Sequence, residues 1–335
     1  GVSAEASSLA GTQKLSSLKV IYDDNRISID GDTHNAFTED VGARYLAYGW
    51  RVIDVPSQED GNVDRTALDK AMLDAAAESE RPTLIRLKSV IAWPAPKARN
   101  TAKSHGSALG AEEIAATKQL LGLPTEEFYY PAEIKTHVES VITRNQKLKS
   151  IWLESFTSWS SKNPEKAKLL ARLENNQLPQ EIEKSFPLFS YGKEIATRKA
   201  SGEVINSLAK VLPELIGGSA DLAESNNTTI DNGGSFLPAS SMMNGANPYG
   251  RNIFFGIREH AMGAILNGMA LHGGLIPFGG TFLVFSDYMR GAVRLSALMQ
   301  LPVTYIWTHD SMASEKMVQP ISQSSISHPL ELCRV

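Results

Sequence analysis

Cysteine is almost absent from this chain of 335 residues, since Cys333 is the only one. A single cysteine excludes an internal disulfide framework and favours a reducing compartment, which predicts a cytoplasmic protein. Charge of one sign is also scarce, because the formal net charge at pH 7 is only -4. Without a strongly basic balance, nucleic acid is not an expected partner.

Long hydrophobic runs are missing as well. The longest apolar stretches, residues 261–266 and 298–307, are short or interrupted by polar residues. A membrane-spanning helix needs about 18 or more apolar residues in succession, so we expect no membrane partner. The chain opens at Gly1 on an Ala/Ser-rich stretch without a targeting pattern, which favours a start inside a longer gene over removal of a leader.

What the sequence contains is typical of a soluble globular protein, with 42% hydrophobic and 21% charged residues and room for two domains. Short β-branched runs alternate with helical patterns, such as those at residues 39–48 and 66–79. This alternation predicts an α/β fold with parallel sheets covered by helices on both faces. The predicted strands are residues 18–22, 51–55, 83–88, 214–217, 252–256, 275–279 and 303–307.

A polar section without strand patterns separates two α/β regions. It predicts a long helix over residues 132–160, a shorter helix over 164–174 and a Pro- and charge-rich linker over 178–187. A helix over residues 192–212 then opens the second α/β region. The predicted organisation is therefore a first domain at 1–130, a helical connector at 131–190 and a second domain at 191–311.

The first predicted strand ends in a polar turn that contains Asp23, Asp24 and Asn25. Ligands of open α/β sheets bind beyond the carboxyl ends of the strands, and carboxylate and amide oxygens suit Mg²⁺. The alternative is a polar turn that only closes a strand.

The run Gly-Ile-Arg-Glu-His-Ala-Met-Gly at residues 256–263 places Glu259 where a strand passes into a helix over 259–271. A carboxylate there could simply complement the helix dipole. Further on, Phe282, Phe285 and Tyr288 are spaced by three, so on a helical turn they would share one face and could stack on a flat ring. Such stripes are more often part of a core.

Arg198 opens the second region's first helix, where a positive charge does not help the helix dipole. Its planar guanidinium suits phosphate oxygens, and Ser225 and His105 could add hydrogen bonds. The glycines at 217–218 predict a turn that a ligand can approach closely. The alternative for Arg198 is a solvated surface charge.

These motifs resemble the transketolase family. The resemblance rests on four stretches: Ile-Tyr-Asp-Asp-Asn-Arg-Ile at residues 21–27, Ser-His-Gly at 104–106, the run at 256–263 and Gly-Gly-Thr-Phe at 279–282. The resemblance implies thiamine diphosphate and Mg²⁺ as cofactors, with Glu259 hydrogen-bonded to the cofactor's aminopyrimidine ring. It implies the following roles: metal ligation by Asn25 and Ile27; cofactor contacts by Glu5, Asp221, Phe282, Phe285 and Tyr288; sugar-phosphate binding by His105, Arg198, Ser225 and His309, with Glu259 and His105 catalytic.

The same resemblance implies transfer of a two-carbon ketol unit between sugar phosphates, as in the pentose phosphate pathway, by a homodimer with its active sites at the interface. Glu5 then belongs to a carboxylate network at that interface. Dihydroxyacetone synthase and deoxyxylulose phosphate synthase are related alternatives, which the Ser-His-Gly run and the pair Arg198 and Ser225 disfavour.

The resemblance ends abruptly at Ser311. If one base is inserted within the codon of Met312, the shifted frame is compatible with the family's next residues, so we interpret 312–335 as an out-of-frame tail. Both domains would then be incomplete, lacking a Gly-Asp-Gly metal motif before Gly1 and everything after about residue 311. This chain alone is therefore expected to have little or no activity, and a non-catalytic remnant is the alternative to an active transketolase.

Overall fold

The computed structural model describes residues 2–310, which form two compact units; the tail predicted for 312–335 lies outside this range. The three-strand unit consists of Ala10–Asn163. Within the described residues, the six-strand unit consists of residues 2–9 and 164–310. Helix α1 (Val2–Thr12) starts in the six-strand unit and ends in the three-strand unit. Each unit is named after its main sheet.

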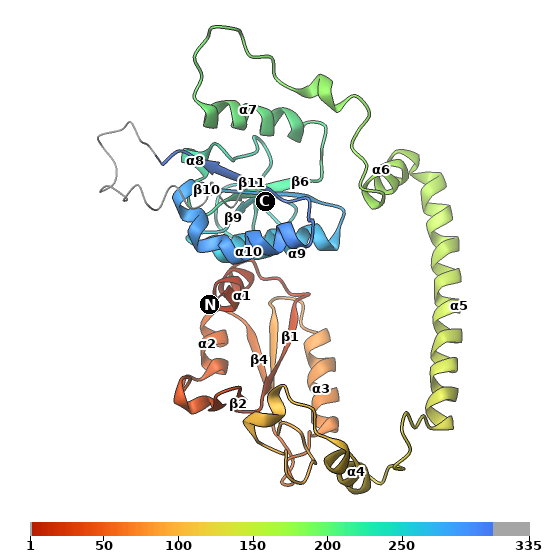
Figure 1. Cartoon of the computed structure of the whole chain (residues 1–335). Coiled ribbons are helices and arrows are strands. Elements are labelled where there is room, and N and C mark those ends of the chain that lie inside the picture. The colour runs from red at the N-terminus through yellow and green to blue at the C-terminus, as the bar shows by residue number, and fades with distance from the viewer. Residues whose placement is uncertain (1, 311–335) are drawn as a thin grey trace. The chain divides into compact units, whose positions relative to one another are not determined.

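A parallel sheet with a helix on each side forms the three-strand unit (Figure 1). The strand order is β1-β5-β4, and the bounds are β1 (Lys19–Asp24), β5 (Thr83–Lys88) and β4 (Arg51–Val55). Helices α2 (Val41–Ala47) and α3 (Arg65–Ala76) pack on it. Asp40 and Asp64 cap them by accepting backbone N–H groups, which is why both helices begin where they do.

Alternation along the strands gives each helix its own core. Leu84 of β5 is buried in a cluster with Trp50 and partly buried residues of α2. The next residue, Ile85, points to the opposite face and joins Ala71 and Ala75 of α3. Successive side chains of a strand face opposite sides, so these neighbours anchor the sheet from both faces.

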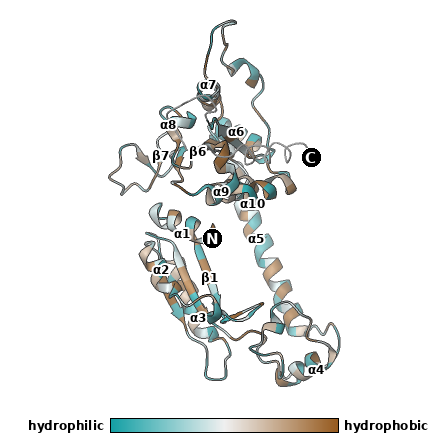
Figure 2. Cartoon of the chain, turned by 60° about the vertical axis from the view of Figure 1, so that its left-hand side comes forward, coloured by the Kyte–Doolittle hydropathy of each residue, from teal (hydrophilic) through white to brown (hydrophobic). Residues whose placement is uncertain are grey.

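The remainder of this unit is built from short elements and the long connector helix. The bounds are β2 (Ile27–Ser28), β3 (Gly31–Asp32), η1 (Thr33–Asn35), η2 (Ala102–His105), α4 (Ala111–Leu120) and α5 (Ala132–Lys162). Apolar residues recur along α5 (Figure 2), and its rings at Trp152, Phe156 and Trp159 stack in sequence. Among residues 2–310, no helix combines the length and apolar character that crossing a membrane requires.

Six parallel strands form the second sheet, in the order β11-β10-β6-β9-β7-β8. The bounds are β6 (Leu215–Ser219), β7 (Ser235–Phe236), β8 (Ala246–Asn247), β9 (Asn252–Phe254), β10 (Ile276–Phe282) and β11 (Thr304–Thr308). Helix α7 lies on one face, and α9 and α10 lie on the other (Figure 1). The helices and 3₁₀ turns are α6 (Pro164–Glu174), η3 (Ile182–Ser185), α7 (Thr197–Ala209), α8 (Ala223–Asn226), α9 (Glu259–His272), η4 (Leu283–Phe285) and α10 (Ser286–Leu298).

Close packing against glycine holds α9 on this sheet. A Cβ at Gly279 of β10 would lie 2.5 Å from a methyl carbon of Leu266, so only glycine lets the helix approach this closely. Leu266 has no exposed surface and packs with Phe255 and Met262 in the main core cluster. On the other face, Phe278 packs with Ile205 of α7. The sheet is therefore buried on both faces, as parallel sheets usually are.

The structure confirms the predicted α/β class with parallel sheets and helices on both faces. Strands 51–55 and 83–88 and helix 164–174 have the predicted bounds. The glycine turn predicted at 217–218 is wrong, because both glycines lie inside β6. A Cβ at Gly217 would lie 2.0 Å from the carbonyl oxygen of Phe278, and one at Gly218 would lie 1.9 Å from that of Ile253. These glycines accommodate neighbouring strands.

Candidate functional site

Glu259 lies at the start of α9, just beyond the carboxyl end of β9. The chain leaves the strand through Phe255, which is fully buried, and turns at Gly256 with φ of +67°. Glycine adopts this conformation without the strain that a side chain would introduce. Glu259 is thereby brought into the first helical turn with 8% of its surface exposed. The predicted passage from strand to helix at this residue is confirmed.

A second carboxylate, that of Glu5 on α1, caps the same helix. Its Oε2 accepts a hydrogen bond from the backbone N–H of Ala261 at 3.0 Å. Arg258, the residue before α9, donates to Ser8 Oγ of α1 at 3.2 Å. Carboxylates are favoured at helix N-termini because the first N–H groups lack partners within the helix. The start of α1 thus brings a negative charge close to Glu259.

Burial raises the pKa of Glu259 above its ordinary value, and the charge of Glu5 raises it further, against the effect of a backbone hydrogen bond. Removal from water disfavours the ionised form of a carboxyl group. Such a carboxyl keeps its proton at a pH where an exposed glutamate has lost it. It can therefore donate a hydrogen bond to an acceptor such as a ring nitrogen.

Three aromatic rings form a row next to this carboxyl. The ring centroids of Phe282 and Phe285 are 5.8 Å apart, and those of Phe285 and Tyr288 are 5.9 Å apart. The sequence predicted one helical face, but the residues lie at the end of β10, in η4 and at the start of α10. The 3₁₀ turn has three residues per turn, so the spacing of three still aligns the rings.

Asp310, which sequence reasoning did not single out, holds this row in place. Its Oδ1 accepts the backbone N–H of Val284 at 3.0 Å, which ties η4 to the end of β11. The only signal in the sequence is its place directly after His309, and a partly buried contact with a backbone group leaves no pattern along the chain.

A hollow of about 550 Å³ opens between these elements. Its lining includes Glu5, Glu259, Phe285 and Tyr288, and also Asp221, which has the uncommon φ of +61° in the turn after β6. A lining of carboxylates and aromatic rings suits a flat, polar, partly cationic ring. The predicted cofactor residues Glu5, Asp221, Glu259, Phe285 and Tyr288 therefore meet in one place, while Phe282 lies behind Phe285 in the row.

Arg198 and His309 form a pair at the same end of the sheet. Arg198 Nη1 lies 2.8 Å from His309 Nε2, and the His309 ring lies edge-on to Phe282 with centroids 5.3 Å apart. Both side chains of the pair are exposed. Ser225 lies on α8, which packs against α7 and β11. A guanidinium and an imidazole presented together to solvent can bind an anion such as a phosphate group.

The polar turn after β1 has most of its oxygens occupied. Asp24 has 3% of its side chain exposed and pairs with Lys88 at 2.5 Å and Arg26 at 2.9 Å, while Asp23 accepts from Ser89. Asn25 Oδ1 accepts the backbone N–H of Ile27 at 3.0 Å, and its Nδ2 contacts Asp23. The two aspartates are thus engaged as partners of cations and a hydroxyl, while the side-chain oxygen of Asn25 holds the backbone of Ile27. Asn25 and Ile27 are the two residues that the resemblance implies as metal ligands.

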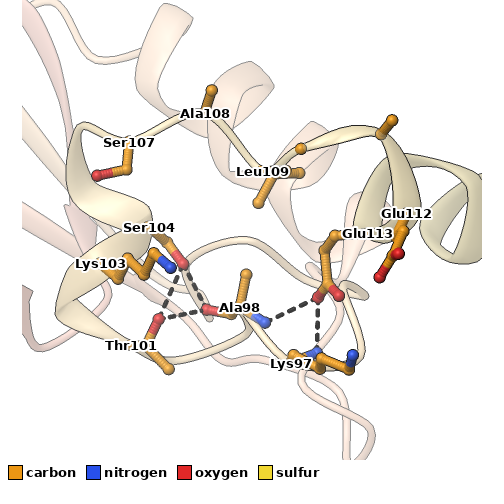
Figure 3. A pocket seen from close by; sticks show the side chains of 12 residues that line it. Lys97, Ala98, Thr101, Lys103, Ser104, Ser107, Ala108, Leu109, Glu112 and Glu113 are labelled. Carbon is orange, nitrogen blue, oxygen red and sulfur yellow. Dashed lines mark hydrogen bonds between the residues drawn. The ribbon is translucent and has the colours of Figure 1, made fainter.

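His105 ends the 3₁₀ turn η2, in a loop that a buried carboxylate anchors (Figure 3). Glu113 Oε1 accepts the backbone N–H groups of Lys97 at 2.6 Å and Ala98 at 2.8 Å. These two hydrogen bonds hold the pKa of Glu113 below its ordinary value. A hollow of about 520 Å³ lies beside them, and its lining includes Lys97, Ala98 and Glu113 but not His105.

The predicted site residues divide between the units. Asn25, Ile27 and His105 belong to the three-strand unit, and the others belong to the six-strand unit, where they gather at the carboxyl ends of β6, β9, β10 and β11. Within residues 2–310, no three His, Cys, Asp or Glu side chains come together as a metal-binding group.

Comparisons with known proteins also find two domains in this chain. Residues 1–179 match the family model described as the thiamine diphosphate binding domain of transketolase, and residues 193–328 match the transketolase pyrimidine binding domain. The chain is 47% identical to the transketolase of Mycobacterium leprae over 316 residues and 48% identical to that of Geobacillus stearothermophilus over 315 residues. Each alignment covers 93% of this chain, against 45% and 46% of the respective relative, so the chain spans less than half their length.

Solved structures give the same result. A Pichia stipitis transketolase in complex with sedoheptulose-7-phosphate has a TM-score of 0.87 and 42% identity, over 93% of this chain and 46% of the other. The transketolase of Leishmania mexicana has a TM-score of 0.86 and 38% identity, over 93% of this chain and 45% of the other.

Fold and matches together define the class: the chain carries two parallel α/β domains of the kind that binds thiamine diphosphate. Within that class, it belongs to the transketolase family.

Proposed function

We propose that the protein transfers a two-carbon ketol unit from a ketose phosphate to an aldose phosphate, with thiamine diphosphate and Mg²⁺ as cofactors. The observation that carries this proposal is the buried Glu259 beside an aromatic row, in the same unit as the exposed pair Arg198 and His309. One feature suits a flat heterocycle, and the other suits a phosphate.

The residues of the hollow fit the pyrimidine end of thiamine diphosphate. Glu259 can hold a proton toward a ring nitrogen, and Phe285 and Tyr288 can stack on the ring. Asp221 offers a negative charge to the cationic part of the cofactor, and Glu5 holds the start of α9. When bound, thiamine diphosphate supplies the nucleophile of the reaction, while the protein orients and tunes it.

Asn25 and the carbonyl of Ile27 are the proposed Mg²⁺ ligands in this chain. Both are hard oxygen donors, which Mg²⁺ prefers. The pairing of Asp24 with Lys88 and Arg26 supports this choice, because a carboxylate already neutralised by two cations gains little from a third.

The substrate end of the proposal rests on four residues. Arg198, Ser225 and His309 bind the phosphate group, and His105 donates a hydrogen bond to the sugar's oxygens. The solved Pichia stipitis relative holds a sugar phosphate, which supports this substrate class. A homodimer with active sites at its interface, and a cytoplasmic location, belong to the same proposal.

Calorimetry of the purified chain with thiamine diphosphate tests the cofactor assignment. We expect binding that requires Mg²⁺ and weakens at least tenfold, or about 1.4 kcal/mol, in Glu259→Ala. Glu203→Ala, an exposed glutamate on α7, is the matched control and should change the affinity less than twofold. Equal affinities in the two variants would contradict the role of Glu259. Formation of sedoheptulose 7-phosphate from xylulose 5-phosphate and ribose 5-phosphate by the protein isolated from its source tests the reaction itself.

A further inference from the structure

A fully buried amide, that of Asn226, connects the elements at the phosphate end of the site. Its Nδ2 donates to Thr308 Oγ1 at 2.5 Å, and its Oδ1 accepts from Ser219 Oγ at 3.1 Å. The Ser219 hydroxyl also lies 2.8 Å from Thr228 Oγ1. Because Ser219 gives its proton to Asn226, Thr228 must donate to Ser219. The result is a chain of neutral hydrogen bonds, in which each bond polarises the next.

Glycine at position 280 leaves space for this chain of hydrogen bonds between Thr228, Ser219, Asn226 and Thr308. A Cβ on Gly280 of β10 would lie 2.7 Å from Thr228 Cγ2 and 2.9 Å from Ser219 Oγ, closer than such atoms can approach. Asn226 and Thr228 have no exposed surface, and Ser219 has 3%. The polar chain therefore links β6, α8 and β11 across the carboxyl edge of the sheet, from a buried centre to the partly buried Thr308.

Each end of the central hydrogen bond is next to a proposed phosphate-binding residue. Ser225 directly precedes Asn226 on α8, and His309 directly follows Thr308 at the end of β11. The hydrogen bond between Asn226 and Thr308 thus fixes the spacing of α8 and β11 where these residues leave the backbone.

Helix α7 is set against the same assembly. A Cβ on Gly202 would lie 2.8 Å from the carbonyl oxygen of Asn227, so α7 packs directly on the end of α8. Arg198 lies one turn earlier on α7 and reaches His309. The elements that carry Arg198, Ser225 and His309 are therefore all held by one buried contact region.

We propose that Asn226 and Thr308 are positioning residues, whose hydrogen bond sets the geometry of the phosphate-binding group Arg198, Ser225 and His309. This inference rests on the proposed function. Because the link is neutral, it fixes the backbone without drawing the charge of Arg198 away from the ligand. Phosphate binding by two or three side chains from different elements depends on their spacing to within a fraction of an ångström.

Thr308→Val tests the link because it keeps the shape of the side chain and removes the hydroxyl. Thr308→Ser restores the hydroxyl. Thr304→Val, an exposed threonine at the start of the same strand, is the matched control. The double variant Asn226→Leu with Thr308→Val removes both partners of the central hydrogen bond together, while Ser219 and Thr228 keep the hydrogen bond between their hydroxyls.

Two measurements on the purified chain separate positioning from stability. The first is the ¹⁵N signal of the His309 ring without ligand, assigned with His309→Gln. The second is the dissociation constant for ribose 5-phosphate. We expect Thr308→Val and the double variant to shift the ring signal and weaken binding about tenfold, Thr308→Ser to restore both, and Thr304→Val to change neither.

An unchanged ring signal and affinity in folded Thr308→Val would overturn the positioning role. Failure of the wild-type chain to bind ribose 5-phosphate, with the ring signal still shifted in Thr308→Val, would refute the phosphate assignment of the proposed function and leave the structural link standing. The two failures are thus distinguishable.

Discussion

The two units hold their binding residues by different means. In the three-strand unit, the loop that carries His105 is anchored by a carboxylate, because Glu113 accepts the N–H groups of Lys97 and Ala98. In the six-strand unit, the edge that carries Ser225 and His309 is fixed by neutral amide and hydroxyl groups around Asn226. One anchor depends on a charge, and the other does not.

This difference predicts how a change of pH or of side-chain packing should affect each region. Hydrogen bonds to a carboxylate are stronger than neutral ones, but they weaken when the carboxylate is protonated. A buried neutral network keeps its bonds at every ordinary pH, yet it has little tolerance for a lost partner or added volume. The six-strand edge should therefore be sensitive to packing, and the His105 loop to pH.

The largest expected effect comes from adding one methyl group to the neutral network. Gly280→Ala places a Cβ against Thr228 and Ser219, so we expect a loss of about 1–3 kcal/mol in the free energy of unfolding. Urea unfolding at pH 5 and pH 8 measures it, and the loss should be the same at both values because no titrating group belongs to the network.

Gly268→Ala is the matched control for this change. No heavy atom lies within 4 Å of the position where its Cβ would be, and Gly268 lies inside α9. Alanine is the better helix former, so this variant should gain about 0.5–1 kcal/mol. A destabilisation of equal size in both variants would show that the tight contact at Gly280 is not what matters.

The strands and helices of both units are easier to predict from the sequence than the hydrogen bonds that anchor the binding residues. Residues 51–55 and 83–88 read as strands because apolar β-branched residues cluster there between turn residues, and the structure confirms both. The two-residue strands β7 and β8 were not predicted, since a pair of residues carries no periodicity.

The candidate site shows the same division. Glu259 and the aromatic row are predictable because each lies in a short continuous stretch of sequence, residues 256–263 and 282–288 respectively. Asn226 and Asp310 are not, because their partners are distant in sequence: Asn226 bonds to Thr308, and Asp310 bonds to the N–H of Val284. The glycines at 217–218 predict a turn wrongly, because a turn and a crowded strand place the same demand on sequence, namely the absence of a side chain.

A smaller effect of opposite sign is expected at Glu259, a buried carboxyl group of the six-strand unit. Its raised pKa means that it contributes stability fully below the unfolded-state pKa and loses it as the pH rises through the folded-state pKa. Glu259→Gln removes the buried charge, so the variant should be more stable than wild type at pH 8, by about 0.5–2 kcal/mol. At pH 4 the difference should shrink.

Thermal unfolding at several pH values measures this difference, with the exposed Glu224→Gln as control. A variant that is less stable than wild type at pH 8 would mean that the backbone hydrogen bond to the Glu259 carboxylate outweighs the effect of its burial. Ionised carboxylates would then stabilise both units, Glu259 in the six-strand unit and Glu113 in the three-strand unit, and the contrast between the units would be weaker.

The smallest expected effect is at the charged anchor itself. The pKa of Glu113 is lowered by the N–H groups of Ala98 and Lys97, so its contribution to stability is present above the unfolded-state pKa and is lost as the pH falls through the folded-state pKa. Glu113→Gln keeps an acceptor oxygen and loses only the charge, so at pH 7 its melting temperature should be slightly lower than that of wild type, and the two should converge toward pH 3. Glu112→Gln, the exposed neighbour on α4, controls for loss of a charge at the helix start. A difference that stays constant from pH 7 to pH 3 would show that shape rather than charge anchors the His105 loop, and the two units would then hold their binding residues in the same way.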